Sequence, residues 1–217
     1  MDVRMFTVGM VQENCFLARR DGGDHAVIVD PGDEAEKLLG AIDALGVTLD
    51  AILLTHTHFD HVGAVAPMAK ATGAPVYCPG LEREVLADIM RFVPWPGIGP
   101  FESYDADETV EGGERLQLAG MDIEVLHTPG HSPGHVTYAV QQEGALFSGD
   151  VLFQGSAIKA LVGAVILFLF FSFLSKGTTT GGAITMSIVA LVLYTPVMFA
   201  TDKFIYQRKQ KALTPKG

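Results

Sequence analysis

The feature that most constrains this chain is a run of metal-ligand side chains at residues 55–61. His56, His58, Asp60 and His61 follow an apolar segment that has the character of a buried strand. Four polar side chains this close together cannot all enter an apolar core. Residues two apart in an extended segment face the same side, so His56 and His58 can converge on one ion. Imidazole and carboxylate groups are ligands of Zn²⁺, so the run predicts a catalytic zinc site; the alternative is a polar loop with surface histidines.

A second histidine cluster supplies what the first run lacks, because a catalytic zinc usually keeps three protein ligands and a water. His127, His131 and His135 are the candidates for the third ligand. Prolines between them exclude a helix, so a spacing of four residues does not place all three on one face, and at most one or two reach the metal. Asp150, after a short apolar run and a glycine, is a natural carboxylate bridge between two ions.

The pattern of apolar runs predicts an α/β layered domain with function at strand ends. Strands are expected at residues 3–8, 14–18, 26–29, 51–54, 75–77, 114–118, 121–126, 136–140 and 145–147. Helices are expected at residues 35–45, with Asp33 as N-cap, and at residues 62–72 and 81–92. The proline-rich segment at residues 94–101 holds the single tryptophan and is either a plain connector or the wall of a substrate pocket.

Charge divides the chain into two unlike parts. Residues 1–156 carry 24 Asp and Glu against 8 Lys and Arg, whereas residues 157–217 carry one acid against 7 Lys and Arg. The first part has no basic patch, which argues against nucleic acid as a partner. Its two isolated cysteines, Cys15 and Cys78, indicate free thiols in a reducing compartment, and the N-terminus does not resemble a signal peptide. The first domain is therefore predicted to be cytoplasmic.

The second part has the composition of a membrane hairpin. Residues 157–175 contain one charge, and residues 183–200 contain none, so each is long and apolar enough for a transmembrane helix. The alternative is a pair of buried core helices, but a run of phenylalanines leaves no polar face for a soluble helix. The basic flank after residue 200 places the C-terminus in the cytoplasm, on the same side as the acidic domain.

Three motifs resemble, in order, those of the metallo-β-lactamase superfamily, and within it the glyoxalase II-like hydrolases. Residues 55–61 match its HxHxDH signature, and residues 127–135 and 148–150 match its next two motifs. The resemblance implies an αβ/βα sandwich with metal ions at one edge. It also implies the ligand sets: His56, His58 and His131 on the first ion, Asp60 and His61 on the second, and Asp150 bridging both. His127 and His135 would then orient ligands, and the Asp30-Pro31-Gly32 run matches a strand-end motif near the site.

The resemblance implies hydrolysis of a thioester, such as an acylglutathione, by metal-activated hydroxide. Zinc lowers the pKa of bound water from about 16 to near 7, and Asp60 or Asp150 would hold the hydroxide and take its proton. Iron or manganese would suit the same ligands. The expected partners are a small acyl or thioester substrate and, through the C-terminal hairpin, a membrane.

The chain departs from the family pattern after residue 156. No histidine follows His135, so the second ion lacks a ligand, and the last layer of the sandwich is truncated before the two-helix hairpin. Two hypotheses follow. The first is a membrane-tethered zinc hydrolase with an incomplete second site. The second is a non-catalytic membrane protein that carries a truncated metal-binding domain, as a fusion or frameshift product.

Overall fold

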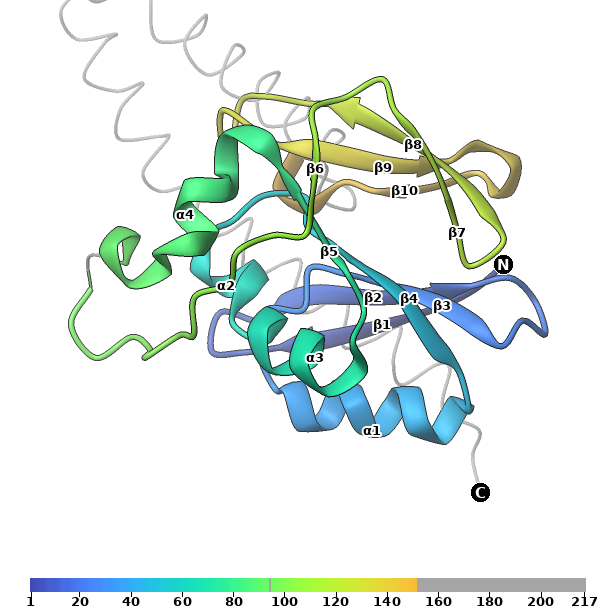
Figure 1. Ribbon diagram of the computed structural model, residues 1–217, viewed down its shortest axis with the longest axis horizontal. Coiled ribbons are helices and arrows are strands. Elements are labelled where there is room, and N and C mark those ends of the chain that lie inside the picture. The colour runs from blue at the N-terminus through green and yellow to red at the C-terminus, as the bar shows by residue number, and fades with distance from the viewer. Residues whose placement is uncertain (94, 152–217) are drawn as a thin grey trace, which may run out of the picture. The chain divides into compact units, whose positions relative to one another are not determined.

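The computed structural model describes residues 1–93 and 95–151 (Figure 1). The chain divides into two units, Met1–Val151 and Leu152–Gly217, and the fold described below is that of the first. The predicted membrane helices at 157–175 and 183–200 and the predicted truncation of the last layer lie outside the described residues. Within the described ranges, no helix has both the length and the apolarity needed to cross a bilayer.

A six-stranded sheet forms the centre of the described fold, with its strands in sequence order. The strands are β1 (Asp2–Val8), β2 (Glu13–Arg19), β3 (His25–Val29), β4 (Thr48–Leu53), β5 (Val76–Pro79) and β6 (Glu108–Val110). The pairs β1–β2 and β2–β3 are antiparallel, and β3 to β6 pair in parallel. The short strand β6 was not predicted, because only its last residue, Val110, is buried and three residues give no clear alternation.

A second, antiparallel sheet packs on one face of the first (Figure 1). Its order is β10 (Ala145–Phe147), β9 (Val136–Val140), β8 (Met121–His127) and β7 (Arg115–Leu118). The predicted hairpin is confirmed: β7 pairs with β8 across a turn at Ala119 and Gly120, both with positive φ. Such a turn matches the twist of the strands it joins.

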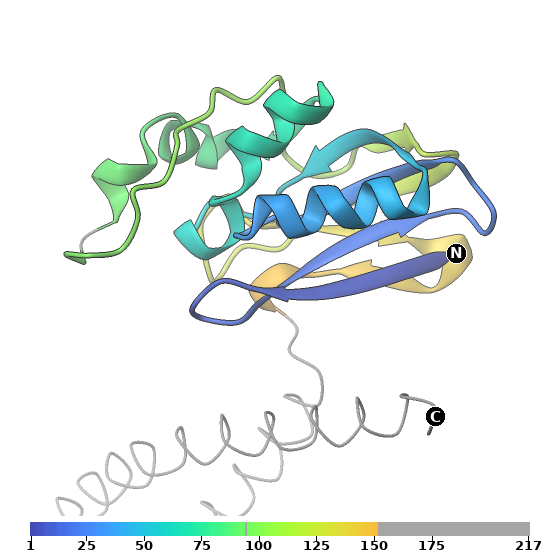
Figure 2. The same ribbon diagram turned by 90° about the horizontal axis from the view of Figure 1, so that it is seen from below.

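Helices α1 (Ala35–Leu45) and α3 (Val65–Thr72) lie on the opposite face of the large sheet, as Figure 2 shows from below. The alternation of β3 explains the layering. Ile28 packs in the core between sheet and helices, while Val27 and Val29 pack between the two sheets. Because both faces are covered, β3 and β4 read as nearly continuous apolar runs rather than as alternating ones. The order helices, sheet, sheet gives three layers of the predicted αβ/βα sandwich.

Most strands and the bounds of the helix at residues 35–45 were predicted correctly, but the N-cap of that helix and the other two helices were not. The predicted N-cap Asp33 is wrong: Glu34 holds that position in the left-handed conformation, without a side-chain cap. The predicted helix at residues 62–72 is two helices, α2 (Phe59–Val62) and α3, because the Ala64 N–H bonds to the Pro31 carbonyl instead. Both errors come from contacts that are distant in sequence or from backbone geometry that the apolar stripe does not encode.

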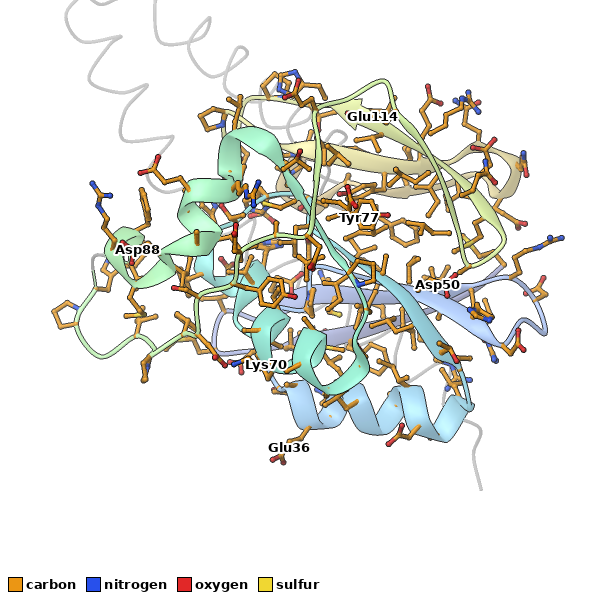
Figure 3. All side chains as sticks on the ribbon, in the orientation of Figure 1. Glu36, Asp50, Lys70, Tyr77, Asp88 and Glu114 are labelled. Carbon is orange, nitrogen blue, oxygen red and sulfur yellow. The ribbon has the colours of Figure 1, made fainter. Side chains whose placement is uncertain are left out.

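The predicted helix at residues 81–92 is also broken. Its pieces are η1 (Gly80–Glu82), α4 (Arg83–Ala87) and η2 (Ile89–Phe92), with Asp88 in a non-helical conformation between the last two (Figure 3). The Leu86 carbonyl accepts from Tyr104 N, and Ile89 N donates to Ser103 Oγ. The returning chain therefore takes the backbone groups that a continuous helix would use.

Several chain segments that follow strand ends meet at one edge of the two sheets. Parallel pairing brings the residues after β3 and β4 to this edge, and the loop after β8 and η4 (Gly149–Val151) after β10 reach it from the second sheet. Two hydrogen bonds join the sheets there: Val136 N donates to the Thr55 carbonyl at 2.9 Å, and Tyr138 Oη to the Leu54 carbonyl at 3.0 Å. The edge is thus rigid where the predicted ligands are concentrated.

Candidate metal centre

Three imidazoles meet at the edge, two from the loop after β4 and one from the loop after β8. His58 Nδ1 lies 3.1 Å from His56 Nε2 and 2.8 Å from His131 Nε2. Among the described residues, two groups lie close enough to hold a cation. These three histidines form one, and Asp30, His56 and His61 form the other. The predicted third partner, His131, is thus brought to His56 and His58 across 73 residues of sequence.

The hydrogen bonds of His56 leave Nε2 free to act as a ligand. Thr55 Oγ1 donates to Asp30 Oδ2 at 2.6 Å, so it accepts from His56 Nδ1 at 3.0 Å. This assignment makes Nδ1 the protonated nitrogen and Nε2 the lone pair. One proton on His58 Nδ1 cannot satisfy both facing nitrogens. A cation would satisfy all three, so the residues fit a metal ion.

Asp30 organises the site from beneath. Its Oδ1 accepts from Thr55 N at 2.7 Å, and its Oδ2 also lies 3.1 Å from His61 Nδ1. Asp30 is 2 % exposed and has a positive φ of 50°, a conformation uncommon outside glycine. Its carboxylate therefore orients His61 directly and His56 through Thr55. The sequence marked the motif around Asp30 but gave no role for this side chain.

His61 and two carboxylates form a second, looser set. His61 Nε2 lies 3.4 Å from Asp150 Oδ1 and 3.8 Å from Asp60 Oδ2, without the alignment of a hydrogen bond. This nitrogen is buried and has no hydrogen-bond partner, which is costly unless a cation occupies the space before it. Asp150 Oδ2 lies 3.4 Å from His131 Nε2, so its two oxygens face the two histidine sets. That placement suits the predicted bridge.

The two histidine sets differ in electrostatics. Burial, followed by the neighbouring imidazoles, lowers the pKa of His56, and burial with the adjacent His131 lowers the pKa of His58. Burial also acts to lower the pKa of His61, but the nearby carboxylates of Asp150 and Asp30 outweigh it and raise that pKa to about 11. Without metal, these shifts favour neutral His56 and His58 at pH 7 and a cationic His61.

The remaining histidines of the second cluster lie outside the nitrogen triad. His127 is exposed, and its Nε2 lies 3.2 Å from the Pro133 carbonyl. His135 is fully buried, with Nδ1 3.0 Å from Thr128 Oγ1 and Nε2 without a hydrogen-bond partner. Of the three candidates, the structure brings only His131 into the described nitrogen triad; that at most one or two of them reach the metal stays a prediction.

Two buried carboxylates near the site were missed. Glu13, at the start of β2, places Oε1 3.6 Å from His61 Nδ1, and burial raises the pKa of Glu13 to about 9. Glu82 contacts Thr57 and Gly134 in the two histidine loops. An isolated acid in a predicted strand or helix gives no signal of such a contact. Gly32 allows the close packing here, since a Cβ on it would lie 1.6 Å from the Asp60 carbonyl oxygen.

A cleft of about 370 Å³ opens beside Asp60. Its other lining residues come from the β1–β2 turn, the segment after β3, α2 with the residue after it, and the proline-rich loop: Gly9, Met10, Val11, Gly32, Asp33, Phe59, Gly63, Gly97, Ile98, Gly99, Pro100 and Phe101. Phe59 contacts the rings of Trp95 and Phe101, each with centroids 5.7 Å apart. The proline-rich loop therefore lines a cleft, and its role as the wall of a substrate pocket stays a prediction.

Comparison with known proteins assigns the family. The family model for the metallo-β-lactamase superfamily matches residues 8–192. The hydroxyacylglutathione hydrolase GloC of Haemophilus influenzae is 35% identical over 71% of this chain and 74% of its own length. The crystal structure of BLEG-1, a B3 metallo-β-lactamase, has a TM-score of 0.65 at 38% identity, covering 70% of this chain and 73% of its own. That of TTHA1623 in a di-iron-bound form has a TM-score of 0.55 at 41% identity, covering 70% and 74%.

The family match runs past residue 156, where the motifs end, so that boundary stays a prediction. With the fold, the convergent histidines and these relatives together, the chain belongs to the metallo-β-lactamase superfamily.

Proposed function

We propose that this chain is a metal-dependent hydrolase that cleaves thioesters of the hydroxyacylglutathione type. The observation that carries the proposal is the convergence of three imidazole nitrogens on one point, with the Asp150 carboxylate 3.4 Å away and a cleft beside it. The fold family supports a hydrolase, and the relative GloC, a hydroxyacylglutathione hydrolase, supports the substrate class.

In this proposal His56, His58 and His131 hold the first cation. His61, Asp60 and Asp150 hold a second one, with Asp150 between the two. A bound divalent cation would supply a Lewis acid and would make water acidic enough to ionise near pH 7. Zinc is our first choice; the di-iron form of TTHA1623 supports iron as the alternative.

The chain's own residues supply the proton transfer and the substrate contacts. Asp150 is the first candidate to accept a proton because of its position, with one oxygen 3.4 Å from His61 Nε2 and the other 3.4 Å from His131 Nε2. Burial opposes its ionisation, but His61 lowers its pKa and keeps the carboxylate ionised. Asp60 lies where the cation set meets the cleft and is the alternative acceptor. The cleft walls, Phe59 and Phe101 among them, exclude water from the part of the substrate next to the scissile bond.

The test is hydrolysis of S-lactoylglutathione by the purified full chain, loaded separately with zinc and with iron. His58→Ala removes the central nitrogen of the triad and should abolish turnover. His25→Ala is the matched control, since His25 is an exposed histidine that pairs with Asp50. Turnover no higher in the parent than in His58→Ala would reject the proposal.

The second candidate is a protein that binds metal without catalysis. It is favoured by the looser geometry around His61 and by the lack of any histidine after His135. Stoichiometric zinc binding with no turnover on any thioester or ester would support it, and sequencing the genomic locus across codons 150–165 would test for a frameshift or fusion.

Attachment to a membrane, with both the first domain and the C-terminus in the cytoplasm, is a further part of the proposal. It rests on the apolar composition of residues 157–175 and 183–200 and on the basic flank that follows. Fractionation of cells that express the full chain tests it. Recovery in the membrane fraction, resistant to high salt and released by detergent, is expected; recovery in the soluble fraction would contradict it.

A further inference from the structure

One buried carboxylate, Glu82, joins the two loops that carry the nitrogen triad. Glu82 is 5% exposed and ends the short helix η1. Its Oε2 accepts from Thr57 Oγ1 at 3.0 Å, and its Oε1 accepts from Gly134 N at 2.8 Å. Thr57 lies between His56 and His58, and Gly134 belongs to the same loop as His131. One side chain therefore holds both loops at once.

The contact with the second loop depends on a glycine. A Cβ at Gly134 would lie 2.6 Å from Glu82 Cγ and 3.0 Å from Oε1. Any other residue at this position would push the loop away from the carboxylate. The junction is thus built for close approach, and the hydrogen bond from Gly134 N forms only because the side chain is absent.

Glu82 is also unusual because it is a buried carboxylate without a cationic partner among the described residues. Within residues 1–93 and 95–151, no lysine, arginine or histidine forms an ion pair with Glu82. A buried carboxylate without a cationic partner is costly to desolvate, so its two hydrogen bonds to the loops are what compensate it. An ordinary structural role would be served as well by an apolar side chain.

We propose that Glu82 is a positioning residue that sets the separation between His58 and His131 and so prepares the first cation site. The two nitrogens lie 2.8 Å apart, on loops that are remote in sequence and fixed to opposite oxygens of the same carboxylate. The inference rests on the metal site of the proposed function, and Glu82 itself would contact neither cation nor substrate.

The experiment compares Glu82→Ala with Glu84→Ala in the full chain. Glu84 lies two residues further on in α4, and its exposed side chain pairs only with the exposed Arg91. Zinc affinity is measured by competition with a chromogenic chelator. Loss of a group that orients ligands typically weakens metal binding roughly 10- to 100-fold, which is the expectation for Glu82→Ala, with no change for Glu84→Ala.

Thermal unfolding of the metal-free proteins separates positioning from folding. Glu82→Ala should still unfold cooperatively above the temperature of the zinc titration. Equal zinc affinity in the folded variant and the parent would overturn the proposal. If Glu82→Ala does not fold, Thr57→Val, which removes one of the two hydrogen bonds and keeps the shape, takes its place, and Thr57→Ser is its control.

The conservative variant Glu82→Gln tests whether zinc affinity depends on the two hydrogen bonds that join the loops or on the negative charge of Glu82. Its amide oxygen can accept from Gly134 N while its NH₂ group donates to Thr57 Oγ1, so both loops remain joined. Near-parent zinc affinity is expected. Affinity as weak as that of Glu82→Ala would mean that the negative charge matters and the link does not, which contradicts the proposal.

Gly134→Ala tests the same junction from the other loop. Its methyl group should displace the loop and weaken zinc binding by a similar factor. In the Glu82→Ala background the part of that loss that comes from the clash with Cγ and Oε1 should vanish, while the approach to Leu81 Cβ at 3.0 Å remains. Fully additive losses would contradict the junction. Since all of these readouts are zinc affinities, failure here with normal turnover rejects the role of Glu82 alone, whereas a parent chain that binds no metal rejects the proposed function.

Discussion

The first and second cation sets share an edge of the sheets but are assembled differently. His58 Nδ1 lies within hydrogen-bonding distance of one nitrogen of His56 and one of His131, and the lowered pKa values of His56 and His58 favour neutral rings at pH 7. His61 faces carboxylates at 3.4 Å and 3.8 Å and is cationic without metal. The first set is a preformed ligand cage, whereas the second is an ion-pair cluster that a metal must reorganise.

The two sets differ in whether their ligand nitrogens carry protons before metal binds, and this difference should affect how tightly each set binds a cation. Burial and the neighbouring imidazoles lower the pKa of His56 and His58 in the first set, so their nitrogen lone pairs are available before metal arrives. Carboxylates around His61 hold a proton in the second set, so a cation there competes with that proton. The first site should therefore bind more tightly, and the four predictions below test this order.

The largest effect is expected for His131→Ala. Removing one of three converging nitrogens should lower zinc affinity and turnover by roughly 10³-fold, since the cation contributes several kcal/mol to catalysis and each 1.4 kcal/mol is about tenfold. Zinc titration and thioester hydrolysis measure it. His127→Ala, at the end of β8 just before that loop, should match the parent, because the His127 side chain is exposed and its Nε2 lies 3.2 Å from the Pro133 carbonyl, outside the nitrogen triad. Equal losses in both variants would show that the loop, and not the nitrogen, matters.

His61→Ala should leave the first set loaded. The bound metal should fall by about one ion per chain, while the tighter binding step stays at its parent affinity. Metal analysis after gel filtration, with a two-step chelator titration, measures both quantities. Loss of all metal would show that the two sets are one cooperative site and would break the comparison.

Thr55→Val should weaken the first set by roughly 10- to 100-fold in zinc affinity. The change removes the hydroxyl between Asp30 and His56, so the protonated Nδ1 of His56 loses its acceptor. Thr48→Val, at the exposed start of the strand that precedes Thr55, is the control. An unchanged affinity in Thr55→Val would mean that Thr55 does not set the His56 tautomer.

The smallest expected effect is in the number of protons that are released when each cation binds. The pKa of His61 lies above neutral, so binding at the second set should release about one proton, and its affinity should rise with pH across the neutral range. The pKa values of His56 and His58 are lowered, so these two ligands should release no proton in the first binding step, and the first step should release fewer protons than the second. Calorimetry in buffers of different ionisation enthalpy measures the protons released, and equal release in both steps would contradict the assignment.

Much of this fold could be predicted because its strands are buried on both faces and read as apolar runs. The helix ends and the broken segment at residues 81–92 could not, because their backbone groups are claimed by residues 103–104 and by the Pro31 carbonyl. No local pattern records such competition. The motif resemblance named the ligand candidates, but Glu82 and Glu13 gave no sign in the sequence, since a lone acid normally marks a solvated surface.

The sequence alone determined the family and the chemistry on offer, because ligand-type side chains packed into residues 55–61 have few other uses. It also left His127, His131 and His135 as alternatives in its own terms. Only the tertiary structure decided that His131 meets the first loop, that Asp150 faces both histidine sets and that Glu82 ties the loops together. The physical reason is that ligand geometry depends on contacts between sheets, which form between residues remote in sequence.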